Sequence, residues 1–352
     1  MVDQILSHLK VVELASVLAG PAVGQFFSEL GAEVVKIENS RTGGDVTRSW
    51  KLPSEDSGSQ ESAYYRAVNW RKQVHMLDLR KSEEREAAYG LIDQADVVIS
   101  NFSTEKARGL GVDGATLSAR NPKLIFARLD AFGPDSTRPA YDIVLQAETG
   151  FLSMSGTEMG ELCRMPVALI DILAAHQLKE GILLALLRRA ETGRGATVTT
   201  NLYASGLASL ANQATNYLIA GYIPRPMGAR HPNIAPYGDL FTLSDGIRIV
   251  LAVGSDRQFH ALCRLLNLKV KSEWTTNATR VVNRADVVRE LGLALSSWRS
   301  SDFEQAAHEA RVPFGRVRNM QEVFATAQAQ ASLLEYEDGQ RSVKTVAFQL
   351  SE

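Results

Sequence analysis

The chain has 352 residues, of which 45% are hydrophobic and 22% charged, and its formal net charge at pH 7 is -2. This length predicts two or three domains, because a domain averages about 150 residues, and the composition is that of an ordinary globular protein. The small net charge excludes nucleic-acid binding driven by bulk electrostatics.

The two cysteines, Cys163 and Cys263, lie far apart in apolar surroundings without a C-x-x-C partner. This pattern excludes a disulfide framework and a structural zinc site, and it fits a reducing cytoplasm. The N-terminus lacks a signal-peptide pattern, and no apolar run approaches the roughly 18 residues that span a membrane. We therefore expect a cytoplasmic protein with no membrane or nucleic-acid partner.

Strands and helices alternate through the first part of the chain. Residues 9–14 (LKVVEL) predict a buried strand, 19–30 a helix that Gly31 closes, and 32–38 a second strand. Such a βαβ unit predicts a parallel sheet with right-handed crossovers. Further elements follow the same pattern: strands at 74–79, 95–102 and 123–129, and helices at 81–95 and 116–121. The predicted fold class is α/β, with a Rossmann-like doubly wound sheet in a large domain.

The first strand-to-helix turn, SVLAGPAVG, is not G-x-G-x-x-G, and no acidic residue follows at the ribose position. A dinucleotide site of the usual kind is therefore excluded. Ligands of doubly wound sheets bind beyond the carboxyl ends of the strands. Val17, Asn101, Phe102 and Asp130 fall at these ends.

A smaller α+β domain follows a helix predicted at 202–219 and a proline-containing segment at 221–236. Residues 239–253 predict a β-hairpin, residues 255–266 a capped helix, and VPFG at 312–315 a return linker. The predicted organisation is a large domain, a helical linker, a small α+β domain, and a return linker with the C-terminal part of the large domain, over residues 1–200, 201–225, 226–310 and 311–352.

The segment PVALIDILAAHQLKEGILLALLRRAETGRG (166–195) places a single carboxylate, Asp171, before a long helical pattern. Two compatible interpretations remain open. Asp171 caps the helix through its free N–H groups, or it is a nucleophile whose ionised form those N–H groups favour.

Motifs for other chemistries are missing from the sequence. There is no G-x-S-x-G elbow, Walker A loop, H-E-x-x-H or metal-ligand spacing, so no metal is expected. His176 lies off the helical face of Asp171 and is assigned to packing. The basic residues of the first half are compatible with a solvated surface. The residues alone predict an α/β protein that binds a small molecule, and they name no reaction.

A series of motifs runs in order from residue 11 to residue 284: VVELASVLAGPAVGQFFSELGAEVVKIE, GGDVTRSW, NWRKQVHMLDLR, ADVVISNF, NPKLIF, RPAYDIVLQAETG, the Asp171 stretch with TGRG, and NATRVVNR. In this order the series resembles the class III CoA-transferases, the group of formyl-CoA transferase, carnitine CoA-transferase and α-methylacyl-CoA racemase.

The resemblance implies transfer of coenzyme A between an acyl-CoA thioester and a free carboxylic acid, through an aspartyl-CoA thioester on Asp171. Coenzyme A and acyl-CoA are then substrates, and no cofactor is permanently bound. Backbone N–H groups at the helix start would stabilise the developing oxyanion. The resemblance also implies a homodimer of two interlocked rings.

The family's site residues carry over to matching positions. Lys72, in the N-x-x-K segment, is expected at the CoA phosphates, and Asp142 close to the nucleophile. The full expected set is Val17, Leu18, Lys72, Asn101, Phe102, Arg108, Leu110 and Arg138 for coenzyme A, and Trp50, Tyr141 and Asp142 for the substrate pocket.

Some positions depart from the family pattern. The Pro and Gly of its N-F-x-P-G segment are missing after Asn101-Phe102, and Gly109 replaces an expected Arg. The racemase branch has a His in place of Tyr141, and racemisation needs two acid/base groups. Transfer is therefore predicted, with racemisation and a non-catalytic CoA-binding protein as alternatives.

Overall fold

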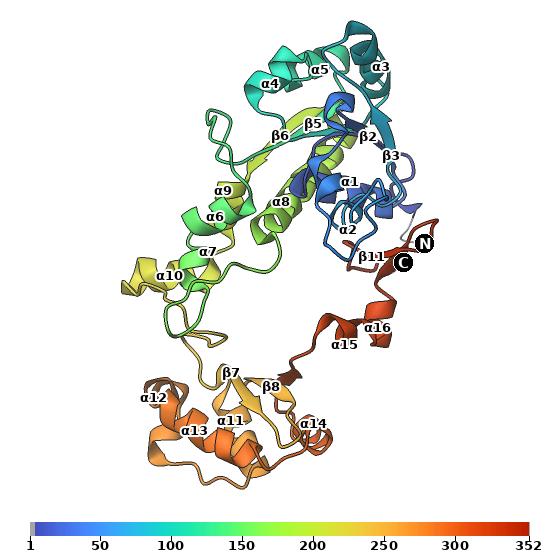
Figure 1. The fold of residues 1–352 in the computed structure, drawn as a ribbon. Coiled ribbons are helices and arrows are strands. Elements are labelled where there is room, and N and C mark those ends of the chain that lie inside the picture. The colour runs from blue at the N-terminus through green and yellow to red at the C-terminus, as the bar shows by residue number, and fades with distance from the viewer. Residues whose placement is uncertain (1–3, 352) are drawn as a thin grey trace. The chain divides into compact units, whose positions relative to one another are not determined.

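The computed structural model describes residues 4–351 (Figure 1). Contacts within the chain divide it into two compact units. The first unit contains the chain up to Leu152, Arg164–Pro224, and the tail from Ala331; the second contains Ser153–Cys163 and Arg225–Gln330. The chain thus leaves the first unit and later returns to it.

The first unit is built on a six-stranded parallel sheet. Its strands are β1 (Lys10–Leu14), β2 (Glu33–Glu38), β3 (Gln73–Met76), β4 (Val97–Ser100), β5 (Ile125–Asp130) and β6 (Ala196–Asn201). The strand order is β3-β2-β1-β4-β5-β6, and every neighbouring pair is parallel. This order confirms the predicted α/β fold with a doubly wound parallel sheet.

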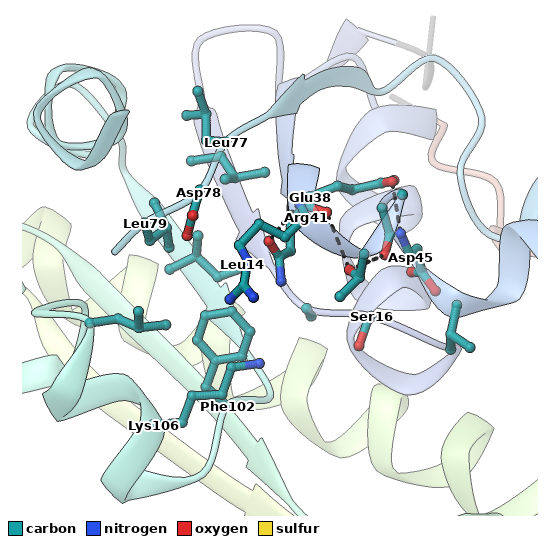
Figure 2. A pocket seen from close by; sticks show the side chains of 18 of the residues that line it. Leu14, Ser16, Glu38, Arg41, Asp45, Leu77, Asp78, Leu79, Phe102 and Lys106 are labelled. Atoms are coloured by element: carbon teal, nitrogen blue, oxygen red, sulfur yellow. Dashed lines mark hydrogen bonds between the residues drawn. The ribbon is translucent and has the colours of Figure 1, made fainter. Parts of the chain in front are cut away.

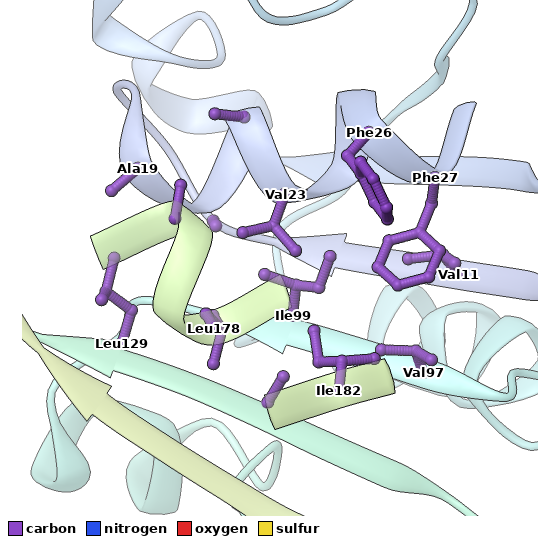
Figure 3. Packing of buried hydrophobic residues seen from close by; sticks show 14 of the residues in the cluster. Val11, Ala19, Val23, Phe26, Phe27, Val97, Ile99, Leu129, Leu178 and Ile182 are labelled. Atoms are coloured by element: carbon purple, nitrogen blue, oxygen red, sulfur yellow. The ribbon is translucent and has the colours of Figure 1, made fainter. Parts of the chain in front are cut away.

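Helices cover both faces of this sheet. The helices up to the second unit are α1 (Ala19–Glu29), α2 (Ala63–Arg66), α3 (Ser82–Ile92), α4 (Thr104–Gly109), α5 (Gly114–Arg120), α6 (Asp142–Glu148), α7 (Phe151–Met154), α8 (Leu169–Thr192), α9 (Leu202–Ala208) and α10 (Ala211–Ala220). Val11 and Ile99 pack with α1 and α8 on one face (Figure 3), whereas their neighbours Val12 and Val98 pack with α3 and α5 on the other. Strands buried on both faces read as continuous apolar runs, which is why the sequence shows them clearly.

The second unit has its own core around Phe259, Trp274 and Phe303. Its antiparallel sheet has the order β7-β8-β9, formed by β7 (Tyr237–Thr242), β8 (Arg248–Ala252) and β9 (Phe314–Arg316). The helices after β8 are α11 (Asp256–Leu265), α12 (Asn277–Val282), α13 (Arg284–Leu295), α14 (Ser300–Glu309), α15 (Met320–Phe324) and α16 (Ala327–Gln330).

Three parts of the structure differ from the sequence prediction. β6 was not predicted, because its sequence ATVTTN is rich in threonine and half exposed at the edge of the sheet. The single helix predicted at 202–219 is two helices, since Ala211 has a positive φ of 48° at the break. The predicted return linker at 312–315 forms β9 instead, so the contacts of the second unit continue to Gln330.

The C-terminal tail is fastened to α1 by one carboxylate. It forms the hairpin of β10 (Leu333–Glu335) and β11 (Arg341–Val343). Beyond the hairpin, Glu29 accepts hydrogen bonds from the N–H groups of Thr345 and Val346 and from the Thr345 hydroxyl, at 2.9–3.0 Å. Within residues 4–351, no helix combines the length and apolar character that a membrane crossing requires.

Candidate active site

A cavity of about 650 Å³ opens at the carboxyl ends of β1 to β4 (Figure 2). The strand order reverses between β1 and β4, and this is the place where open α/β sheets bind ligands. The larger apolar side chains of its wall include Leu14, Ile37, Leu77, Leu79, Phe102 and Leu110. Phe102 and Leu110 belong to the predicted coenzyme A residues, and the structure brings them together here.

Besides Arg48, which pairs with Glu38, three exposed cations line the cavity: Arg41, Arg80 and Lys106. The Lys106 ammonium lies 3.9 Å from the centre of the Phe102 ring. An apolar slot beside exposed cations suits a base with attached phosphates, since guanidinium and ammonium groups pair with phosphate oxygens. Sequence analysis missed these three residues, although Arg80 ends one of the family motifs and Lys106 follows Asn101-Phe102 by one helical turn.

Other predicted coenzyme A residues lie outside this wall. Asn101 instead holds the turn after β1, because its side-chain amide donates to the Ser16 carbonyl at 2.8 Å and accepts from the Ser16 N–H at 3.2 Å. Val17 and Leu18 continue this turn into α1. Arg108 is exposed, and Arg138 pairs with Glu148 at the surface.

The position of Lys72 does not fit the predicted phosphate contact. Its ammonium is fully buried and donates to Glu13 Oε2 at 2.7 Å, to the Pro21 carbonyl at 2.8 Å and to Asn69 Oδ1 at 3.0 Å. An ammonium has three N–H donors, and all three are used. Burial lowers the pKa of Lys72 to about 7. Lys72 is therefore a buried counter-ion in this structure.

Asp171 lies in the first turn of α8 and is buried, but it does not cap the helix. The N-cap position is Ala168, without a side-chain hydrogen bond. The cap comes from another helix: Asp142 Oδ1, on α6, accepts from the N–H of Ile170 at 2.7 Å and of Asp171 at 3.3 Å. Gln146 donates to the second oxygen of Asp142 at 2.5 Å. The capping interpretation of Asp171 is therefore wrong.

The N–H groups in the first turn of α8 all have hydrogen-bond partners within the protein. Those of Ile170 and Asp171 bond to Asp142, and those of Leu169 and Ile172 bond to the carbonyls of Val167 and Ala168. In this structure they do not point to an incoming oxyanion, in contrast to the sequence expectation. Burial, followed by the negative charge of Asp142, raises the pKa of Asp171 to about 7.

Three aromatic side chains gather next to this pair of carboxylates. The Trp50 ring lies 5.1 Å from Tyr64 and 6.1 Å from Tyr141. Burial, followed by the charges of Asp171 and Asp142, raises the pKa of Tyr64. Trp50, Tyr141 and Asp142 were predicted at the substrate pocket; Tyr64 was not, because no spacing in the sequence connects it with Asp171.

Comparison with known proteins identifies the family. The model of CoA-transferase family III matches residues 6–351. The chain belongs to this family. A succinate–glutarate CoA-transferase from Agrobacterium fabrum is 36% identical over 95% of this chain and 86% of its own length. The human succinyl-CoA:glutarate CoA-transferase is 31% identical over 92% of this chain and 74% of its own.

Solved structures agree with this assignment. The crystal structure of a CAIB/BAIF family protein from Brucella suis matches with a TM-score of 0.86 and 36% identity, covering 99% of this chain and 93% of that chain. The resemblance read from the motifs is therefore confirmed. The protein is an enzyme of CoA-transferase family III, a family that transfers coenzyme A between acyl-CoA and carboxylic acids.

The raised pKa of Asp171 predicts a stability effect that depends on pH. The ordinary value is 3.8 and the folded value about 7, so ionising this carboxyl costs folding free energy as the pH rises through that window. Asp171→Asn removes the cost. Between pH 5 and pH 8 the free energy of unfolding of the variant should rise relative to that of wild type by about 3 kcal/mol, because one pKa unit corresponds to about 1.4 kcal/mol. Urea denaturation measures this difference.

The exposed carboxylate Asp135 provides the control for that experiment. Asp135→Asn should follow the wild-type profile at both pH values. A difference between Asp171→Asn and wild type that stays constant from pH 5 to pH 8 would contradict the raised pKa.

Proposed function

We propose that this enzyme transfers coenzyme A between an acyl-CoA and a short dicarboxylic acid through an aspartyl-CoA thioester on Asp171. The observation that carries the proposal is the buried Asp171 carboxylate, held in the first turn of α8 beside Asp142 and raised in pKa. A carboxylate of raised pKa is more basic, and it is therefore a better nucleophile once ionised.

The reaction consists of two balanced exchanges. The Asp171 carboxylate attacks the thioester carbonyl, which gives a mixed anhydride and the CoA thiolate. The thiolate attacks the aspartyl carbonyl of the anhydride, which gives aspartyl-CoA and releases the donor acid. The acceptor carboxylate then attacks aspartyl-CoA and frees the thiolate, which takes the acceptor acyl group from the second anhydride and regenerates Asp171. Each step joins species of similar energy.

The cavity at the carboxyl ends of β1 to β4 is the proposed site for the nucleotide end of coenzyme A. Its apolar wall would receive the adenine, and Arg41, Arg80 and Lys106 would pair with the phosphates. The turn from Ser16 to Leu18 lies between this cavity and α1. We assign the aromatic cluster of Trp50, Tyr64 and Tyr141 to the acyl group.

The dicarboxylic acid follows from the relatives and from one cation. Both curated relatives described above carry glutarate in their names. In this chain Arg164 is exposed and interacts electrostatically with Tyr64, in the aromatic cluster. Its guanidinium can pair with the distal carboxylate of a dicarboxylic acid, which a monocarboxylic acid lacks.

Trapping of the intermediate tests the proposal. Wild type incubated with succinyl-CoA should acquire coenzyme A on the peptide containing Asp171, and hydroxylamine should convert it to a hydroxamate. Mass spectrometry detects both products, and Asp171→Ala should give neither. Acetyl-CoA, which has no distal carboxylate, should label more slowly. An adduct on another residue, or transfer by Asp171→Ala, would refute the role of Asp171.

Asp142 predicts a shift in the pH profile of this labelling. The groups that interact with Asp171 are Asp142 from α6 and Tyr64 from α2. Labelling needs the ionised carboxylate, so its rate should rise through about pH 7. In Asp142→Asn the amide oxygen still accepts from Ile170, but the negative charge is lost. The rise should move to lower pH, and the plateau rate should fall because a weaker base is a poorer nucleophile.

Glu148→Gln is the matched control for that measurement, since Glu148 lies on the same helix and pairs with Arg138 at the surface. It should leave the profile in place. If Asp142→Asn lowers the rate without moving the profile, Asp142 acts on the helix start alone.

We also propose an interlocked homodimer. Two features support it: the chain returns to the first unit through the Glu29 contacts, and apolar side chains of α8 and α10 are exposed, among them Leu184, Leu187 and Ile219. Contiguous exposed apolar residues mark association surfaces. If each chain closes a ring around the other, subunits can exchange only after the tail detaches.

Subunit exchange between differently tagged dimers tests this arrangement. Wild type should not exchange under native conditions over days. Glu29→Ala removes the acceptor of the tail and should accelerate exchange, whereas Glu33→Ala, at an exposed position of β2, should not. Rapid exchange of folded wild-type subunits, followed by native mass spectrometry, would contradict the interlocked ring.

A further inference from the structure

Val17, in the turn between β1 and α1, has a left-handed backbone with φ of 73°. Such a conformation is common for glycine, but for a β-branched residue it is a genuine outlier. Strain of this kind persists only where the surroundings impose it, and it gathers at functional sites. The contacts of the turn therefore indicate what the strain achieves.

Two side chains from the segments after β2 and β4 fix this turn. Asn101, after β4, bonds to the N–H and the carbonyl of Ser16. Asp45 accepts from the Val17 N–H, with distances of 3.1 and 3.3 Å to its two oxygens. Ser16 and Asp45 both line the cavity, where Figure 2 shows them on the same side.

Asp45 is itself held by a chain of buried charges. Its Oδ2 lies 2.9 Å from Lys36 Nζ, and Lys36 in turn lies 2.9 Å from Glu13 Oε1. The other oxygen of Glu13 bonds to Lys72. Burial by itself would raise the pKa of Asp45, but Lys36 and the donors of Thr47 hold it below the ordinary value. Asp45 therefore remains a charged acceptor.

The preceding glycine allows Asp45 to reach this position. Gly44 has φ of 96°, and a Cβ there would lie 2.2 Å from Glu38 Oε2. The same oxygen accepts the Asp45 N–H at 2.9 Å. This contact gives a physical reason for the Gly-Gly-Asp motif at residues 43–45, which the reaction itself does not use.

We infer that Asp45 is a positioning residue for coenzyme A: the chain Lys72–Glu13–Lys36–Asp45 holds Val17 in its left-handed conformation and so fixes the wall of the cavity formed by the Ser16 turn. This inference rests on the proposed placement of coenzyme A in the cavity. It also gives Lys72 a role at a distance from the ligand. Without Asp45, Val17 would relax to a negative φ and displace the turn.

Binding of free coenzyme A, measured by calorimetry, tests this inference without requiring transfer. Asp45→Asn should weaken binding roughly tenfold, as expected when a strained residue of this kind loses its support. Val17→Gly alone supplies the reference affinity for the double variant, because it removes the valine side chain together with the strain. In the double variant, glycine adopts the positive φ at little cost, so Asp45→Asn with Val17→Gly should recover most of the affinity.

The control is Val282→Gly, at a highly exposed valine of α12. Combined with Asp45→Asn, it should restore nothing. Normal binding by Asp45→Asn, or no recovery with Val17→Gly, would overturn the inference. If wild type itself does not bind free coenzyme A, the proposed coenzyme A site is overturned instead.

Should Asp45→Asn fail to fold, the thermal midpoint of Val17→Gly provides the second measurement. It should lie above that of Val282→Gly, because only the first substitution relieves strain. A midpoint for Val17→Gly equal to or below that of Val282→Gly would overturn the inference.

Discussion

The Asp142 carboxylate accepts hydrogen bonds from the N–H groups of Ile170 and Asp171 in the first turn of α8, and this contact between two helices fixes where α8 begins. It places Asp171 at the third residue of the helix, next to a second negative charge and away from water. A carboxylate in this environment is harder to ionise, so its pKa rises. Both the location and the basicity of the proposed nucleophile thus depend on a neighbour 29 residues earlier in the chain.

Ionisable groups are used in two ways at the carboxyl edge of the sheet. Lys36, Glu13 and Lys72 are buried and pair with one another, which makes them unsuitable as ligand contacts and suitable as rigid supports. Lys106 and Arg41 are exposed at the cavity and remain available to a polyanion. Burial therefore distinguishes the ionisable groups that support the structure from those that can bind a ligand, although both sets lie at the carboxyl edge of the sheet.

The two parts of the proposed site follow from the doubly wound topology. The cavity uses the reversal between β1 and β4, where the flanking turns diverge and leave space. Asp171 comes from α8, which packs with α1 on one face of the sheet (Figure 3). The turn from Ser16 to Leu18 connects these parts, because it ends β1 at the cavity and begins α1.

The sequence by itself determined the sheet strands with continuous apolar runs, the family through its ordered motifs, and Asp171 as the carboxylate that starts a long helix. These features are local, and the spacing of apolar residues or the order of the motifs is enough to predict them. The sequence could not reveal β6, because its threonine-rich segment lacks the apolar pattern of a strand. Only its pairing with β5 identifies it as one.

Only the tertiary structure decided that Asp142 and not Asp171 caps α8, that Lys72 is buried against Glu13, and that Tyr64 joins the aromatic cluster. Each of these depends on which side chains from distant segments meet and on how much water they exclude. Residue type sets what a group can do, and the burial and partners that folding supplies set what it does here.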